Sequence, residues 1–574
     1  MAEAFSARFL FSESKLSRFL QSESDLAPRR VLVMSAVAGL SNALILALIN
    51  SAAEHAEESQ SRPLFAVAFA VAIVLYAFAQ RWVLIQVAQE IEKIIHKVRM
   101  RIVRRIRDCE LLDIEELGRT VIYSGLARHT QTLSQSASTV TIAVQMAILI
   151  VFTTLYIAYL SLTSFAVLIV FMAIALSIYF RKSFSVRSNL QTSLEMDNGV
   201  YAAVDDLLSG FKEAKLSRRR TQSILKRADA ISSEASAVRG DTQTLLAKNF
   251  IFSQTSFYLL LGTMVFIVPI LSSGYSDEVQ KSTTAVLFII GPISGLIGSI
   301  PIFENASAAA GAIVDLEKRL TDLSQNGTAD SGVDDFTFHP SPSLDDAEPA
   351  FETIELRDAV FRFPPKEGET DEAFKIGPLN LTITRGETTF ITGGNGSGKS
   401  TLLRLLTGLY PLDKGRILLD GKAVKRSGES AQNFRELFSS VFGDFHLSRY
   451  LDGIPPENIE EADYWMERLE IQDKVQIEGD AFSTTDLSSG QRKRLALVAA
   501  ILDRKPILVL DEWAADQDPL FRRTFYRELL PLLKERGHTI IAITHDSRFF
   551  DAAEQQFHME DGKMSDFDPA IFHD

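Results

Sequence analysis

Long uncharged runs separated by charged segments dominate the first half of the chain. Stretches without Asp, Glu, Lys or Arg occur at residues 31–50, 63–80, 130–180, 249–276 and 282–303. A membrane-crossing helix needs about 20 apolar residues, so the stretch at 130–180 is too long for one span. The polar run at 161–164 divides it into a tight hairpin of two spans. The pattern therefore predicts an all-α domain of six membrane-spanning helices over residues 31–320.

The basic residues predict the orientation of these spans. Residues 89–136 contain nine Lys or Arg and residues 181–249 contain twelve, whereas the alternate loops contain only Arg62 and Lys281. Because positive charge marks cytosolic loops, we expect both long loops and both termini in the cytosol. The helical pattern of the spans continues into these loops, which predicts long helices that project into the cytosol, with tips near 111–117 and 207–215.

The first 30 residues predict a short amphipathic segment. Acids and Lys15 interrupt any apolar core, which excludes a secretory signal peptide. We expect the apolar residues to lie on the inner membrane surface before the first span. They are Phe5, Phe9, Leu10, Phe11, Leu16, Phe19 and Leu20.

A change in composition separates this half from the rest. Residues 321–350 contain seven acids and no Lys or Arg, with Pro, Ser and Gly throughout. This composition is typical of a flexible, self-repelling linker. After it, short β-type runs alternate with helical ones, which predicts an α/β domain over residues 351–574.

Composition also narrows the functional classes. The excess of 73 acidic over 59 basic residues argues against a protein that binds nucleic acid by neutralising phosphates. The single cysteine, Cys109, cannot form an intramolecular disulfide, and no Cys/His cluster has zinc-ligand spacing. We therefore expect Cys109 to be a structural thiol.

The strongest motif is G-x-x-x-x-G-K-S at residues 393–400. It follows an expected strand and opens a helical run, a context in which glycines let the backbone wrap phosphates and the helix N-terminus attracts anions. Lys399 is expected to reach the β- and γ-phosphates of a nucleotide, and Ser400 to hold Mg²⁺. The expected phosphate-binding residues are Gly393, Gly394, Asn395, Gly396, Ser397, Gly398, Lys399, Ser400 and Thr401.

A second motif is the apolar run 507–510, which ends in the two acids Asp511 and Glu512. Buried strands often end in an acid, so the pattern by itself is weak. Downstream of a phosphate-binding loop it suits phosphoryl transfer, with one carboxylate on Mg²⁺ and the next on the attacking water. We therefore expect Asp511 to be a metal ligand and Glu512 to be catalytic.

Between these motifs, residues 487–491 read Leu-Ser-Ser-Gly-Gln. Here the sequence resembles the ATP-binding cassette (ABC) superfamily, whose signature is Leu-Ser-Gly-Gly-Gln, and Ser489 replaces one glycine. The resemblance implies that Ser488, Ser489, Gly490 and Gln491 contact the γ-phosphate of an ATP molecule held by the opposite cassette.

The same resemblance assigns roles to further residues. His545 looks like the switch histidine and is expected to be catalytic, Asp518 looks like the D-loop aspartate, and Phe363 sits where an aromatic ring stacks on adenine. One position departs from the family pattern. Gly443 stands where the family has a Q-loop glutamine, so either Asp444 or water takes over the contact of that glutamine with magnesium, or coupling to the membrane domain runs differently.

A six-span domain fused ahead of one cassette is the plan of an ABC half-exporter. The P-loop of one chain must meet the signature of another, so the resemblance implies a dimer, most simply a homodimer, that binds ATP and Mg²⁺. The fusion disfavours an importer with separate permease subunits, and the spans exclude the soluble cassette proteins. The cytosolic tips are expected to dock in clefts of the cassettes, beside the loop 443–446.

The residues around the motifs, at 442–447, 483–497 and 511–519, resemble the bacterial cyclic-peptide exporter group. That group includes exporters of syringomycin-type lipopeptides and pyoverdine siderophore precursors. The resemblance implies a multi-pass protein of the bacterial inner membrane that hydrolyses ATP to export a peptide-like metabolite by alternating access. Two alternatives stay open: a lipid or lipopeptide flippase, and a regulatory protein gated by ATP, against which Glu512 and His545 argue.

Some of the polar residues within the spans could line a translocation cavity, but a structural role is the commoner one. Uncharged polar side chains in membrane helices commonly serve hydrogen bonding between helices or anchoring at the interface. We expect that structural role for Gln145, Tyr156, Tyr159, Gln254 and Tyr258.

Overall fold

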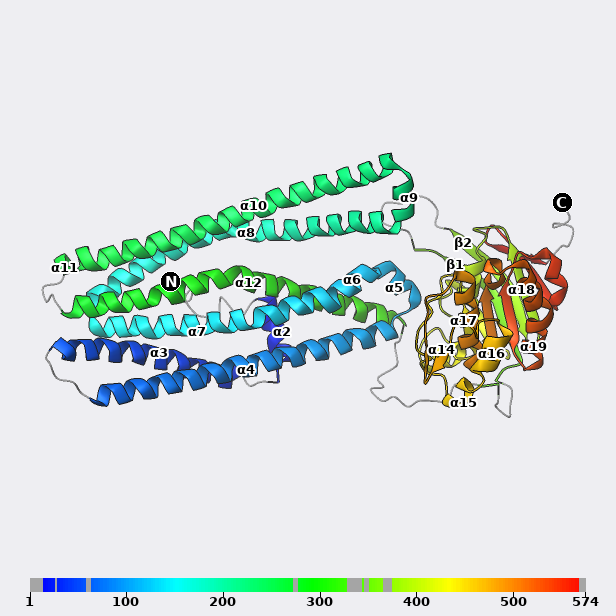
Figure 1. Cartoon of the computed structure of the whole chain (residues 1–574), viewed down its shortest axis with the longest axis horizontal. Helices are drawn as coiled ribbons and strands as arrows, with labels where there is room; N and C mark the ends of the chain where they lie inside the picture. The colour runs from blue at the N-terminus through cyan, green and yellow to red at the C-terminus, as the bar shows by residue number, and fades with distance from the viewer. Residues whose placement is uncertain are drawn as a thin grey trace. The chain divides into compact units, whose positions relative to one another are not determined.

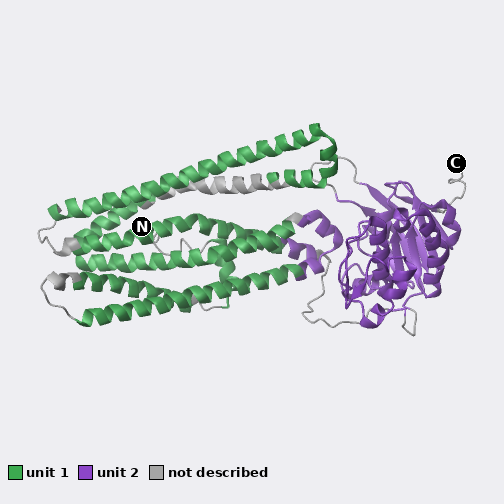
Figure 2. Cartoon of the chain, in the orientation of Figure 1, with its two compact units in different colours: residues 1–103, 120–318 green, residues 104–119, 319–574 purple. Residues whose placement is uncertain are grey.

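The computed structural model describes residues 14–25, 28–57, 63–271, 277–327, 343–344, 350–364 and 374–566. The chain divides into two compact units, shown in different colours in Figure 2. Residues 1–103 and 120–318 form the first unit, and residues 104–119 and 319–574 form the second. The first unit is helical, whereas the second contains both helices and sheets.

Long helices account for most of the first unit (Figure 1). They are α3 (Pro28–Glu57), α4 (Pro63–Asp108), α7 (Thr130–Leu160), α8 (Leu162–Ser209), α10 (Arg218–Gly262) and α12 (Asp277–Gly327). Shorter elements are α2 (Lys15–Glu23), α6 (Arg119–Tyr123), η2 (Ser124–His129), α9 (Phe211–Leu216), η3 (Thr263–Ile267) and α11 (Val268–Leu271).

Five helical segments among the described residues are long and apolar enough to cross a membrane. They are Arg29–Ala52, Pro63–Asp108, Val121–Leu160, Arg218–Ile270 and Lys281–Ser324. The remaining span predicted from the sequence corresponds to a shorter apolar helical segment, Leu162–Ala175. The helical membrane region followed by an α/β region therefore confirms the predicted fold class.

The long uncharged stretch breaks where the sequence predicts. α7 ends at Leu160 and α8 begins at Leu162, and the intervening Ser161 has an extended backbone. The hydroxyl of Ser161 accepts a hydrogen bond of 3.3 Å from the backbone N–H of Ser164. A serine in this position satisfies one of the free donors at a helix start, so it ends one helix and begins the next.

The apolar side of α2 packs against the protein. Leu16 and Phe19 are 3% and 4% exposed, although the sequence predicts that this side faces the membrane surface. Arg101 of α4 lies 2.7 Å from Glu23 of α2 and 2.7 Å from Glu317 of α12, which ties the end of α2 to two long helices. Tertiary partners therefore bury this apolar side. The expected amphipathic residues before position 14 lie outside the described residues.

The expected linker begins later than its composition suggests. α12 continues to Gly327, so residues 321–327 are helical. Most of the remaining expected linker, at 328–342 and 345–349, lies outside the described residues.

Two larger sheets form the framework of the second unit. One is antiparallel, with the order β2–β1–β4–β5, and the other has the order β12–β11–β3–β10–β9–β6, in which all neighbours except β12 and β11 are parallel. The strands are β1 (Thr353–Arg362), β2 (Lys375–Thr384), β3 (Thr388–Gly393), β4 (Lys414–Leu419), β5 (Lys422–Ala423), β6 (Phe438–Val441), β9 (Ile507–Asp511), β10 (Thr539–Ile543), β11 (Gln555–Glu560) and β12 (Lys563–Asp566). A small hairpin joins β7 (Ile477–Glu478) to β8 (Ala481–Phe482).

Helices of the second unit pack around these sheets. They are α5 (Leu111–Leu117), α13 (Lys399–Leu406), α14 (Glu429–Arg435), α15 (Pro456–Ile459), α16 (Ala462–Arg468), α17 (Ser489–Leu502), α18 (Pro519–Thr524) and α19 (Leu530–Glu535). The short turns are η4 (Trp513–Asp516), η5 (Phe525–Leu529) and η6 (Ser547–Ala552).

The central strands β3, β9 and β10 are buried along their whole length. Leu508 belongs to one apolar cluster with Leu495 of α17, whereas the next residue, Val509, belongs to the other cluster with Leu402 of α13. Successive side chains of a strand point to opposite faces, so both faces of this sheet are covered, which explains the unbroken apolar runs in the sequence.

Candidate active site

The loops after β3, β9 and β10 meet at one edge of the six-stranded sheet. Ile543 at the end of β10 pairs with Ile391 of β3 on one side and with Asp511 of β9 on the other. Because the three strands are parallel neighbours, their carboxyl ends lie together. Three groups of residues that the sequence singles out, near 393–401, 511–512 and 545, therefore share this edge.

The loop between β3 and α13 requires glycine for steric reasons. Gly393 has φ +143° and Gly398 has φ +102°, a region that side chains rarely adopt. A Cβ atom on Gly393 would lie 2.2 Å from the carbonyl oxygen of Met559. The loop leads into α13 at Lys399, and the first N–H groups of a helix have no partner within it. This arrangement suits an anion such as a phosphate.

Lys399 projects back into this loop. Its ammonium donates hydrogen bonds to the carbonyl oxygens of Gly393 at 3.0 Å and Gly394 at 2.8 Å. Burial lowers the pKa of Lys399, while the charges of Glu512 and Asp511 oppose that change. An ammonium has three N–H donors, so after these two bonds one donor is left for a phosphate oxygen. The residues present therefore fit a nucleotide polyphosphate.

Asp511 and Ser400 are brought together beside this loop. Burial raises the pKa of Asp511, and hydrogen bonds from the Ser400 hydroxyl and from the backbone N–H of Gly443 oppose that rise. The Gly443 nitrogen lies 3.4 Å from Oδ2 of Asp511. A hydroxyl beside a carboxylate offers the oxygen ligands that Mg²⁺ prefers, so the donor set fits that ion.

Glu512 and His545 form a pair at the same edge. Nε2 of His545 lies 3.1 Å from Oε1 of Glu512. Glu512 has φ +48°, an unfavourable conformation for a residue with a side chain. Such strain persists where the surrounding structure holds it, and it is concentrated at functional sites. The strained turn directs a carboxylate, held by an imidazole, to the end of β9.

The Leu-Ser-Ser-Gly-Gln segment builds the start of α17. The Ser488 hydroxyl accepts a hydrogen bond from the Gln491 N–H at 3.4 Å, and the Gln491 side-chain oxygen accepts one from the Ser488 N–H at 3.2 Å. This reciprocal pair is a capping box. Ser488 and Ser489 are exposed. Within the described part of the chain, no hydrogen bond or ion pair joins residues 488–491 to residues 393–401.

Asp518 and Phe363 have structural partners of their own. Asp518 accepts a hydrogen bond of 3.0 Å from the Phe521 N–H and caps α18, and it lies 3.1 Å from Arg494. The ring of Phe363, just after β1, is edge-on to Phe361, with ring centres 5.0 Å apart. Among the described residues, no hydrogen bond or ring contact joins either residue to the loop 393–401.

The helix α5 carries a set of polar contacts that the motifs did not reveal. The Tyr410 hydroxyl donates a hydrogen bond of 2.6 Å to Glu115 of α5. Arg404 of α13 donates to the Tyr410 oxygen at 2.8 Å and lies 3.7 Å from Glu115. Arg435 pairs with Glu110 at 3.2 Å. One signal was available in the sequence, because residues 110–116 are rich in acids within an otherwise basic loop.

The same contacts reach the loop after β6. Arg404 donates a hydrogen bond of 3.1 Å to Asp444, so the Asp444 carboxylate binds arginine, while the neighbouring Gly443 touches Asp511 through its backbone. α5, Arg404 and this loop surround a cavity of about 440 Å³ lined by Leu111, Ile114, Glu115, Phe442, Asp444 and His446. The helical tip predicted near 111–117 therefore lies beside the loop 443–446, as the sequence analysis expects.

Comparison with known proteins places these features among relatives. Residues 376–515 match the family model described as ABC transporter. The chain is 33% identical over 552 residues to the ATP-binding protein SyrD of Pseudomonas syringae pv. syringae, and the alignment covers 92% of each chain. It is 35% identical to the spermidine/putrescine import ATP-binding protein PotA of Aggregatibacter actinomycetemcomitans, over 30% of this chain and 47% of that protein.

A further relative is the energy-coupling factor transporter ATP-binding protein EcfA3 of Clostridium perfringens, which is 34% identical over 31% of this chain and 65% of its own length. The alignments with PotA and EcfA3 therefore cover less than a third of this chain. The alignment with SyrD covers most of both units.

Proposed function

Because this chain belongs to the ABC transporter family, we propose that it exports a peptide-like secondary metabolite across the bacterial inner membrane. The chain is an ATP-driven transporter with several membrane-spanning helices, and it couples ATP hydrolysis to transport. The proposed cargo is a cyclic peptide, a lipopeptide or a siderophore precursor.

The extent of the similarity to SyrD is the observation that carries this proposal. That alignment covers 92% of each chain. The relatives named as import or energy-coupling proteins align over only 30% and 31% of this chain. The subfamily resemblance in the sequence around Trp513 and Gln517 favours cyclic-peptide exporters over other exporters.

In the proposed reaction, Glu512 is the general base and His545 holds it in place. A carboxylate near the γ-phosphate takes a proton from the attacking water. The 3.1 Å contact with His545 limits the rotation of the Glu512 side chain. Lys399 is proposed to bind the β- and γ-phosphates, and Ser400 and Asp511 to hold Mg²⁺, which neutralises charge on the phosphate oxygens.

We further propose that two copies of the chain complete each ATP site. The exposed start of α17, with Ser488, Ser489, Gly490 and Gln491, is proposed to face the phosphate loop 393–401 of the second copy. Support comes from the start of this 14-residue helix, where the capping box uses the N–H groups of Ser488 and Gln491 and leaves those of Ser489 and Gly490 for an anion. Asp518 is proposed to lie at the contact between the two cassettes, and Phe363 to stack on adenine.

Coupling to the membrane helices is proposed to run through α5. ATP can bias a conformational equilibrium only through its different affinity for the two states. Asp444 and Glu115 both bind Arg404, so movement of the loop beside Asp511 is transmitted to α5. The bundle is thereby proposed to alternate between inward- and outward-facing states. Docking of the second tip, near α9, stays a prediction, as do the cytosolic location of both termini and the cassette.

The experiment that tests the cargo uses inside-out membrane vesicles from cells that produce this chain. We expect ATP to drive accumulation of at least one member of a panel of cyclic peptides, lipopeptides and siderophore precursors. Vesicles with Glu512→Gln, which cannot hydrolyse ATP in this proposal, are the control. If none of the panel accumulates and fluorescent phospholipids cross the bilayer on ATP addition, the chain is a lipid flippase and the proposal is wrong.

A further inference from the structure

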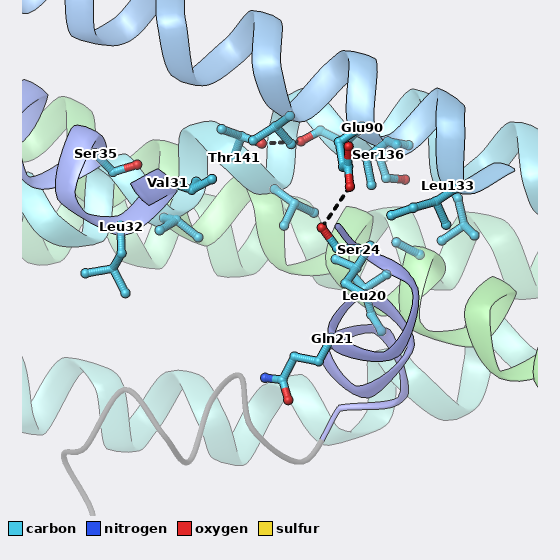
Figure 3. Close-up of a pocket in the computed structure, with 18 residues that line it drawn as sticks. Leu20, Gln21, Ser24, Val31, Leu32, Ser35, Glu90, Leu133, Ser136 and Thr141 are labelled. Carbon is cyan, nitrogen blue, oxygen red and sulfur yellow. Dashed lines mark hydrogen bonds between the residues drawn. The ribbon is translucent and has the colours of Figure 1, made fainter. Parts of the chain in front are cut away.

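An apolar pocket of about 330 Å³ lies within the first unit, between α2, α3, α4, α7 and α12 (Figure 3). Its walls include Leu16 and Leu20 of α2, Leu32 of α3, Ile94 of α4, and Leu133 and Val140 of α7. A volume above about 300 Å³ is in the range of ligand sites. The pocket is remote in sequence from the nucleotide motifs and has no part in the chemistry proposed above.

Two of the hydroxyl groups in its walls are bonded to the backbone of their own helix. Ser136 donates to the carbonyl oxygen of Thr132 at 2.7 Å, and Thr141 donates to that of Ala137 at 2.7 Å. Both bonds lie within α7, so these hydroxyls are satisfied by their own helix. The walls therefore offer an occupant mainly CH groups, which favours an alkyl chain over a peptide backbone or a sugar.

One carboxylate stands in these apolar walls. Among the described residues that line the pocket, Glu90 of α4 is the only ionisable one, and it is 7% exposed. Figure 3 shows Glu90 pointing toward Ser24 at the end of α2. Its Oε1 accepts hydrogen bonds from the Ser24 hydroxyl at 3.2 Å and from the Asp25 N–H at 2.7 Å. A buried negative charge repels an anionic head group and attracts a cationic one.

The pocket opens toward the surroundings of the helices. Leu32, which lines it, is 62% exposed. Glu90 lies on α4 shortly before Lys93 and Lys97, at the end of the span that the basic residues place toward the cytosol. By this topology the pocket lies at the cytosolic end of the spans, with Glu90 among its apolar walls.

We propose that this pocket binds the alkyl tail of an amphiphilic cargo whose head is cationic beside Glu90. A methylene group occupies roughly the volume of a water molecule in the liquid, about 30 Å³, so the pocket holds a tail of about ten or eleven carbons. This inference rests on the proposed export of a peptide-like metabolite, and it narrows that class to acylated, basic peptides.

Photo-crosslinking in the full-length protein tests the pocket without transport. The probe is a ten-carbon alkyl ammonium with a diazirine near the end of its tail, and the matched probe is the carboxylate of equal length. Both are added to protein in phosphatidylcholine nanodiscs. We expect labelling within residues 16–24, 87–94 and 133–144. The ammonium probe should label about tenfold more than the carboxylate probe, because tenfold corresponds to a contact with Glu90 worth about 1.4 kcal/mol.

Two variants make this test specific. Val140→Phe fills the space of about two methylene groups, which lowers labelling about tenfold. Val151→Phe is the matched control, because it makes the same change on α7 at a residue that is 58% exposed and does not line the pocket. Glu90→Gln keeps a hydrogen-bond acceptor for the Asp25 N–H, and it should abolish the preference for the ammonium probe. The inference is wrong if Val140→Phe leaves the labelling yield unchanged, or if the two probes label the wild type equally.

Transport by inside-out vesicles separates this inference from the proposed function. For a basic peptide in acylated and deacylated forms, Val140→Phe should reduce transport of the acylated form only. If wild-type vesicles transport peptides but Val140→Phe changes both forms equally or neither, the export proposal stands and the pocket inference fails. If labelling behaves as expected but no peptide is transported, the pocket binds amphiphiles and the export proposal fails.

Discussion

The Tyr410 hydroxyl donates a hydrogen bond of 2.6 Å to the carboxylate of Glu115, which joins the core of the α/β unit to the loop helix α5. Tyr410 is 2% exposed and stacks on Phe361, with ring centres 5.2 Å apart. Burial, together with the neighbouring carboxylate, raises the pKa of Tyr410 to about 12. The hydroxyl therefore keeps its proton at physiological pH and serves as a fixed donor for α5.

Removing that donor should loosen α5. In Tyr410→Phe, the charged carboxylate of Glu115 loses the hydrogen bond that the Tyr410 hydroxyl donates. A hydrogen bond to a charged group contributes about 1.5–3 kcal/mol. We expect amide hydrogen exchange of residues 111–117 to rise at least about tenfold, while basal ATPase stays close to wild type. Tyr450→Phe is the matched control, because Tyr450 is 55% exposed. Unchanged exchange in Tyr410→Phe would show that α5 is held by its apolar contacts alone.

Hydrolysis should depend on the Glu512 carboxylate. Glu512→Gln removes the proposed base and the charged partner of His545, so ATPase turnover should fall by about 10²- to 10⁴-fold, while ATP binding persists. Lys399→Ala should instead weaken nucleotide binding, since it removes a positive charge from the phosphates. Turnover and binding of a fluorescent ATP analogue in nanodiscs distinguish the two. Glu457→Gln, at an exposed position of the same unit, serves as control. Near-normal turnover in Glu512→Gln would remove that residue from the mechanism.

Mixed dimers should reveal whether two chains share each ATP site. Lys399→Ala disables the phosphate loop and Ser488→Arg disables the start of α17. In the proposed dimer, one site then contains both defects and the other contains neither, so a purified heterodimer should recover part of the ATPase activity that each homodimer lacks. Differently tagged chains allow its isolation. If the heterodimer has no more ATPase activity than the two homodimers, then either the two chains do not share their ATP sites or both sites must function together.

A buried histidine should make the α/β unit sensitive to acid. His538 is 2% exposed, and burial lowers its pKa to about 4, compared with about 6.5 in an unfolded chain. The unfolded state therefore binds the proton more tightly, so the stabilisation is complete above pH 6.5 and is lost as pH falls toward 4. The shift corresponds to about 3 kcal/mol per chain.

We expect His538→Gln to reduce this loss of stability between pH 6.5 and 4, whereas His446→Gln, at an exposed position, should not. Thermal unfolding followed by tryptophan fluorescence measures the effect, because Trp465 and Trp513 lie in the core of this unit. The same acid dependence in wild type and His538→Gln would show that other groups control it.

Features set by neighbouring residues were predictable. The break at Ser161 follows from a polar run within an apolar one, and a serine can cap a helix wherever the chain provides one. The phosphate loop was predictable from its glycines. Gly393 and Gly398 have positive φ values that a residue with a side chain would disfavour. The apolar run before Asp511 predicted a buried strand because both faces of a central parallel strand are covered.

The sequence by itself determined the order of the spans, the nucleotide motifs and the division into a helical and an α/β region, since all of these depend on short-range patterns. Only the tertiary structure decided that α2 buries Leu16 and Phe19, that Asp444 binds Arg404 while Gly443 touches Asp511, and that Tyr410 holds Glu115. Tyr410 and Glu115 are nearly 300 positions apart in the chain. Such pairs form because packing brings distant segments together, and no local periodicity records which polar groups then meet.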